Sequence, residues 1–167
     1  MRNIIFCVLA ACLAAAPLAA APRPVTLDAI DHTAAELIVV GTDGAEATYD
    51  PATLERMPTY SLTTTTPWRS DPAVFEGVLL TDLLAAHGLS DIDAIEVTAE
   101  NDYSVTIPRA VWEEFSILVA TRVDGRAHSR RARGPIQFVI DMDAYSASAN
   151  AREDYLVWMA ARIEPAR

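Results

Sequence analysis

One basic cluster stands out among the residues whose chemistry could serve a function. Its members are Arg122, Arg126, His128, Arg130, Arg131 and Arg133. A guanidinium group is a planar fork that binds oxyanions through paired, charge-assisted hydrogen bonds. The last three arginines lie beside Gly134 and form a candidate site for a phosphate, a carboxylate or a similar anion. The alternative is a solvated turn that balances an acidic surface.

A second candidate site follows a threonine-rich run. Residues 63–66 are all threonine, and Pro67 and Trp68 end the run. We predict a strand over residues 60–66, a polar loop over residues 69–72, and a turn at Gly77 that opens an amphipathic helix. A strand end, a loop and a helix start that converge commonly hold an anion or a cofactor. The ordinary explanation of the threonines is the β propensity of a half-exposed sheet face.

Other chemistries find little support in the sequence. The three histidines, His32, His87 and His128, lie far apart and lack the spacing of metal ligands. We expect His87 to have a structural role at a helix C-terminus. Asp141 and Asp143 lack the glycine-bearing pattern of a calcium loop. No Gly-x-Ser-x-Gly motif indicates a hydrolase.

The charge balance limits the partners. The 167-residue chain has a formal net charge of −10, and all 13 of its basic residues are arginine. Removal of residues 1–21 leaves 12 arginines against 23 acidic residues, a net charge of −11. Such a surface repels nucleic acid and anionic lipid. A bound anion must therefore be met by a local group of arginines.

Residues 1–21 have the pattern of a secretory signal peptide. Arg2 precedes an apolar run over residues 4–18, which is shorter than the ~20 residues of a comfortable membrane span. Residues 19–21 are alanines, the small residues that a signal peptidase requires. A single arginine does not make a twin-arginine signal, so we predict Sec-type export to the periplasm. The competing interpretation is a lipoprotein modified at Cys12, and the apolar run that continues to residue 21 disfavours it.

The predicted mature chain contains no cysteine. Both cysteines, Cys7 and Cys12, lie within the signal segment. Residues 22–167 therefore have no disulfide, no thiolate ligand and no cysteine nucleophile.

The remaining pattern predicts one α+β domain over residues 35–164, preceded by an ordered lead-in over residues 22–34. Short strands alternate with a few short helices, unlike the regular βαβ succession of a parallel sheet. Strands are expected at residues 36–40, 46–49, 60–66, 92–99, 103–107, 117–123, 136–140 and 155–163. Residues 36–40 and 46–49 are expected to form a hairpin through the turn at residues 42–44, and Ile95 alternates with polar neighbours in the strand of residues 92–99. Short helices are expected at residues 52–57, after an Asp50 cap and Pro51, at residues 79–87, ended by Gly88 in a left-handed conformation, and at residues 109–115. Residues 141–154 are expected to form a loop that contains one helical turn. In the last strand, we expect Trp158 to face the core.

Five stretches occur in an order that resembles one known family. They are residues 65–68, 75–84, 101–108, 124–126 and 133–136. Together they resemble the oxidoreductase molybdopterin-binding domain of the sulfite-oxidase superfamily, most of all its small, single-domain, exported branch. The resemblance covers roughly residues 35–164. It implies an irregular fold of several small mixed sheets with short helices.

The resemblance also implies a cofactor cleft. Enzymes of this family hold molybdenum through a pterin dithiolene and one cysteine thiolate, and they act on small substrates such as sulfite. Transferred to this sequence, the residues that edge the cleft are Thr64, Thr65, Trp68, Arg69, Asn101, Tyr103, Arg131, Arg133 and Gly134.

The chain departs from this family at the metal ligand. The position of the cysteine falls within residues 63–68, where a neutral threonine hydroxyl is a poor substitute for a thiolate. Sec export also passes an unfolded chain, which would not carry a non-covalent cofactor. We therefore predict a module that binds a small anion or a periplasmic protein without a molybdenum centre. The alternative is a molybdopterin-dependent oxidoreductase that acts on a small periplasmic substrate, with Thr64 or Thr65 near the metal.

Overall fold

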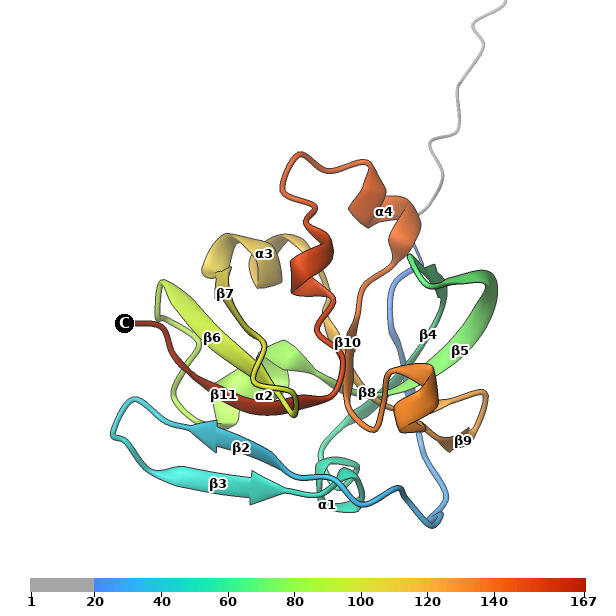
Figure 1. Ribbon diagram of the computed structural model, residues 1–167, viewed down its shortest axis with the longest axis horizontal. Helices are drawn as coiled ribbons and strands as arrows, with labels where there is room; N and C mark the ends of the chain where they lie inside the picture. The colour runs from blue at the N-terminus through green and yellow to red at the C-terminus, as the bar shows by residue number, and fades with distance from the viewer. Residues whose placement is uncertain (1–19) are drawn as a thin grey trace, which may run out of the picture.

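The computed structural model describes residues 20–167, which form an α+β fold (Figure 1). Most of the described chain is strand, arranged in two sheets with a few short helices. The predicted signal peptide lies, except for its last two residues, outside the described residues. Between residues 20 and 167, no helix is long and apolar enough to cross a membrane.

The first sheet is antiparallel. Its strand order is β1-β4-β5-β8-β10, with the short strand β9 paired to β8. The strands are β1 (Arg23–Val25), β4 (Thr59–Thr66), β5 (Arg69–Leu79), β8 (Leu118–Val123), β9 (Arg126–Ala127) and β10 (Gln137–Val139). Strand β1 pairs with β4, so residues 23–25 of the predicted lead-in belong to the sheet.

The second sheet is mixed, because β2 and β11 run parallel and the other pairs are antiparallel. Its order is β3-β2-β11-β6-β7. The strands are β2 (Leu37–Val40), β3 (Glu46–Tyr49), β6 (Ala94–Ala99), β7 (Ser104–Pro108) and β11 (Ala160–Pro165). The predicted hairpin of β2 and β3 is confirmed.

Helices are short throughout the described chain. They are α1 (Pro51–Leu54), α2 (Leu80–Ala86), α3 (Arg109–Glu114) and α4 (Met142–Ser146), with 3₁₀ turns η1 (Arg130–Ala132) and η2 (Glu153–Tyr155). The predicted start of α1 is confirmed: the backbone N–H of Thr53 donates to Asp50 Oδ1 at 2.6 Å, and Pro51 is the first helical residue.

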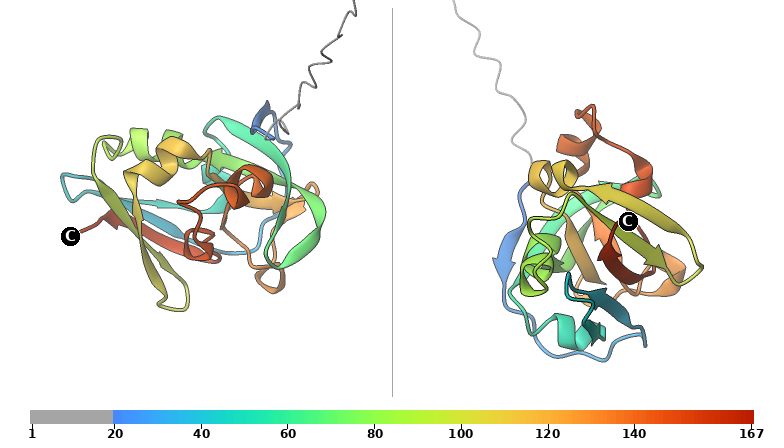
Figure 2. Two further views of the ribbon diagram at one scale, coloured as in Figure 1. Left: turned by 90° about the horizontal axis from the view of Figure 1, so that it is seen from above. Right: turned by 90° about the vertical axis from the view of Figure 1, so that its left-hand side faces the viewer.

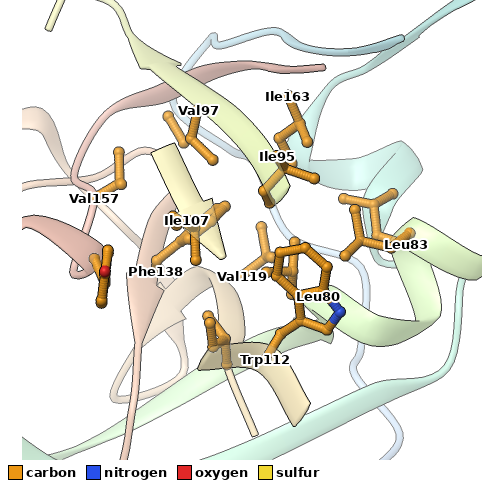
Figure 3. Packing of buried hydrophobic residues seen from close by; sticks show 14 of the residues in the cluster. Leu80, Leu83, Ile95, Val97, Ile107, Trp112, Val119, Phe138, Val157 and Ile163 are labelled. Atoms are coloured by element: carbon orange, nitrogen blue, oxygen red, sulfur yellow. The ribbon is translucent and has the colours of Figure 1, made fainter. Parts of the chain in front are cut away.

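A large apolar cluster unites the two sheets (Figure 3). Figure 3 shows Leu80 and Leu83 of α2, Trp112 of α3 and Phe138 of β10 within this cluster of buried side chains. Alternation in β6 turns Ile95 inward, as predicted from its period of two. A smaller cluster covers the opposite face of the first sheet and comprises Leu62, Ala73, Phe75, Leu118, Ala120 and Val139.

The predicted loop at residues 69–72 and the predicted turn at Gly77 are wrong. Strand β5 begins at Arg69, directly after a tight turn at Pro67 and Trp68, and continues past Gly77. Its polar first residues are exposed at the end of a hairpin, where strand pairing outweighs their turn preference. Position 77 has no room for a larger residue than glycine, because a Cβ there would lie 2.8 Å from the Cα of Ala120 and closer still to the carbonyl oxygen of Val119.

The last strand starts later than predicted. Strand β11 begins at Ala160, whereas Tyr155 belongs to η2. Met159 has a φ of 55°, which interrupts extended chain just before the strand. Trp158 is half-buried and forms an isolated bridge with Gln137, so it does not face the core as expected.

Candidate functional site

A pocket of about 450 Å³ lies where the tip of the β4–β5 hairpin meets the segment from β9 to β10. Figures 1 and 2 show that this hairpin and η1 lie at the end of the molecule opposite the C-terminus. No carboxylate lines the pocket within residues 20–167. Its lining comprises Thr66, Trp68, Arg69, Phe75, Val123, His128, Arg130, Arg131, Ala132, Arg133, Gln137 and Trp158.

Arg133 is held between two tryptophans. Its Cζ atom lies 4.2 Å from the ring centroid of Trp68 and 5.1 Å from that of Trp158. Both distances are within the range of a cation–π interaction. The backbone of Arg133 is fixed as well, because its φ is 75° and its carbonyl accepts a hydrogen bond from Met159 N at 3.2 Å. The guanidinium is therefore positioned before any ligand binds.

The four arginines of the pocket differ in their partners. Arg130 forms two hydrogen bonds of 2.8 Å with Glu100, and Arg69 contacts Asp124 at 3.2 Å. Within residues 20–167, Arg131 and Arg133 have no carboxylate partner. These two cations remain available for an external anion.

A buried histidine lies beneath the arginines. His128 is 2% exposed, and its Nε2 lies 2.8 Å from Gln137 Oε1. Because that oxygen accepts only, Nε2 carries the proton. Burial lowers the pKa of His128, and this outweighs the hydrogen bond with Gln137, which raises it. The ring is therefore neutral near pH 7 and adds no fifth cation. Gly134 packs against it, since a Cβ there would lie 2.5 Å from His128 Cγ.

Arg122, which the sequence groups with the basic cluster, lies in the interior instead. Its side chain is 4% exposed and forms a paired contact with Glu55, whose side chain is 8% exposed. Thr121 donates its hydroxyl hydrogen to Glu55 Oε1 at 2.6 Å, and His32 lies 3.1 Å from Oε2. Although burial raises the pKa of Glu55, the hydrogen bonds from Arg122 and Thr121 hold it below its ordinary value. Arg122 thus stabilises the interior.

The structure brings together part of the predicted site. Four of the predicted residues line the pocket, namely Trp68, Arg69, Arg131 and Arg133, and Gly134 supports it from behind. The other four lie outside the lining, namely Thr64, Thr65, Asn101 and Tyr103. Thr64 is buried, and its hydroxyl accepts a hydrogen bond from Met142 N at 3.0 Å. Asn101 and Tyr103 are exposed at the turn between β6 and β7.

Some pocket residues carry no signal in the sequence. Trp158 and Gln137 come from buried-type segments, and Phe75 has the pattern of a core aromatic. Thr66 lines the pocket in place of its two predicted neighbours. Because residues 155–163 are predicted as one uninterrupted strand, no feature of the sequence indicates a lining role for Trp158.

The donors in this pocket do not suit molybdenum. No cysteine occurs in residues 22–167, and Thr64, near the expected ligand position, already uses its hydroxyl within the fold. Residues 20–167 contain no group of three or more histidine, cysteine, aspartate or glutamate residues that could hold a metal ion. Arginine side chains repel cations and attract oxyanions. The arrangement therefore favours an anionic ligand.

Comparison with known proteins gives no family for this chain. No protein-family model matches the sequence, and no curated protein matches it significantly.

Proposed function

We propose that this chain is an exported domain that binds a small oxyanion. One observation carries the proposal: Arg131 and Arg133 lack carboxylate partners within residues 20–167 and line a pocket without acidic residues, in a chain of net charge −10. Other arginines also lack a carboxylate partner in the described chain, namely Arg23, Arg56, Arg126 and Arg167, but none of them lines this pocket. The concentration of Arg131 and Arg133 at one concave site supports a ligand of opposite charge.

The pocket favours a ligand that is compact and negatively charged. Arg133 offers a fixed fork, and Arg131 is an exposed, adjustable second cation. Two guanidinium groups match the oxygens of sulfate, phosphate or a small carboxylate. A small ligand suits a concave pocket of this size better than the flat contact of a protein partner, which is the other predicted occupant.

We further propose that the fold is that of the molybdopterin-binding domain, retained without its metal centre. The order of the five motifs supports this, as do two sheets of which one is mixed. Export to the periplasm remains part of the proposal and rests on the pattern of residues 1–21. The oxidoreductase alternative lacks a residue able to replace the thiolate, so we derive no redox step.

Substitution of the two unpaired arginines should weaken anion binding. We expect Arg133→Gln and Arg131→Gln each to raise the dissociation constant for phosphate or sulfate at least about tenfold, because each removes a charge-assisted contact. Isothermal titration calorimetry at constant ionic strength measures this. Arg131→Gln is the cleaner variant, since an exposed side chain contributes little to folding.

A matched control is Arg56→Gln, which removes an exposed arginine that does not line the pocket. It should bind the anion like the wild type. Equal binding by the Arg131→Gln/Arg133→Gln double variant would refute the proposed site. Equimolar molybdenum in protein purified from the periplasm of a host that makes the cofactor would refute the metal-free function and favour the oxidoreductase.

A further inference from the structure

Asp141 is a mostly buried carboxylate that has one hydrogen-bond donor and no cationic partner within residues 20–167. It is 8% exposed, and its Oδ2 accepts a hydrogen bond from the backbone N–H of Ala20 at 2.9 Å. Within residues 20–167, this is the only hydrogen bond to its side chain, which does not cap α4. An ionised carboxylate can accept about four hydrogen bonds and is costly to bury without a compensating charge.

A small pocket beside Asp141 has room for a cationic group. It has a volume of about 140 Å³, and its lining includes Asp141, residues 20–22 and a second carboxylate, Glu114. The segments that carry Ala20 and Asp141 are both attached to strand β4. Arg23 of β1 pairs with Ser61 of β4, and Met142 N donates to Thr64 of β4. The chain on both sides of the predicted cleavage site is thereby kept beside Asp141.

We propose that Asp141 binds the α-ammonium group that forms when the signal peptide is removed. The proposal rests on the predicted signal peptide and is independent of the anion pocket. Hydrolysis by a signal peptidase adds one water across the peptide bond, which leaves a carboxylate on the leader and an ammonium on the mature chain. Cleavage before Ala20 creates that ammonium on the nitrogen that already contacts Asp141. Cleavage after Ala21 creates it on Pro22, which lines the same pocket.

Processing changes the chemistry of this contact. In the precursor, the nitrogen of Ala20 is a neutral amide with a single N–H. In the mature chain, an ammonium supplies both a positive charge and additional donors, which satisfies the buried carboxylate. The ion pair then fastens the start of β1 to the start of α4. The mature protein gains this attachment, and the precursor does not have it.

The absence of lysine provides a direct test. All 13 basic residues are arginine, so the α-amine is the only amine in the protein that acylates readily. We would purify the exported protein, identify its first residue by intact mass, and follow acetylation by an N-hydroxysuccinimide ester. A paired ammonium whose pKa rises by about one unit offers tenfold less free amine. The folded wild type should therefore react at least about tenfold more slowly than Asp141→Asn.

Asp143→Asn, which removes an exposed carboxylate two residues away, should react like the wild type. Equal rates for the wild type and Asp141→Asn would overturn the proposal. If Asp141→Asn does not fold, two measurements on the wild type test the proposal. The slow acetylation of its α-amine should become fast in urea, and the acetylated protein should have a lower melting temperature. A mature protein whose mass retains residues 1–19 would overturn the signal-peptide prediction together with this proposal, and the anion site would be unaffected.

Discussion

Arg122→Met should lower the free energy of unfolding by about 3–5 kcal/mol, the cost of removing one partner from a buried ion pair. Glu55 would keep its charge in a site where its side chain is only 8% exposed. Thr121 and His32 also contact this carboxylate and cannot replace the paired guanidinium. Methionine fills most of the space of the arginine stem, so the loss reports the charge and not a cavity.

Urea denaturation measures this loss, with Arg56→Met as the control. Arg56 follows Glu55 in the chain but is exposed, so its replacement should change the unfolding free energy by less than about 0.5 kcal/mol. The double variant Glu55→Met/Arg122→Met should recover part of the loss, because no unpaired charge remains buried. A loss below about 1 kcal/mol for Arg122→Met alone would contradict the buried ion pair.

The unfolding free energy, measured as the pH is lowered, tests the same ion pair a second time. The pKa of Glu55 lies below its ordinary value of 4.5 in the folded state, so the unfolded chain binds the proton more tightly. The stabilisation is therefore fully present above pH 4.5 and decreases as the pH falls through the lowered folded pKa. In Glu55→Gln, the decrease in unfolding free energy that Glu55 causes at acid pH should be absent.

Local sequence patterns predicted the elements whose signals are contained within a few residues. The β2–β3 hairpin has turn chemistry between two apolar runs, and α1 begins with an aspartate cap followed by a proline. The helix of residues 80–86 follows from its apolar stripe, and Gly88 adopts the expected left-handed conformation with a φ of 68°. Each of these features depends on neighbours in the chain and so is visible without a fold.

Long-range pairing decided what the sequence could not predict. Arg122 reads as one more basic residue of a surface cluster, yet its partner Glu55 lies 67 positions away. The polar start of β5 reads as a loop because its pairing with β4 is not local. For the site, adjacent arginines were visible as a cluster, whereas Trp158 reaches Arg133 only because β10 pairs with the chain before β11.

Gly77→Ala should destabilise the protein by about 3 kcal/mol, at the upper end of the range for overpacking. The new methyl group would meet the backbone of Val119 and Ala120 in β8, and backbone cannot rotate away as a side chain can. The ladder between β5 and β8 already shifts its register at Gly77, so further separation would break strand pairing. Urea denaturation should show a lower midpoint with little change in slope.

Gly44→Ala separates this clash from the general cost of replacing a glycine. Gly44 lies in a turn with a φ of 79°, and apart from its chain neighbours no atom lies within 4 Å of the position that a methyl group would take. Only its left-handed backbone therefore opposes alanine, and we expect a loss of about 1 kcal/mol there. A loss for Gly77→Ala no larger than for Gly44→Ala would contradict the close approach of β5 and β8. Since Phe75 lies two residues from Gly77 and lines the arginine pocket, the Gly77 variant should also bind phosphate more weakly, whereas the Gly44 variant should not.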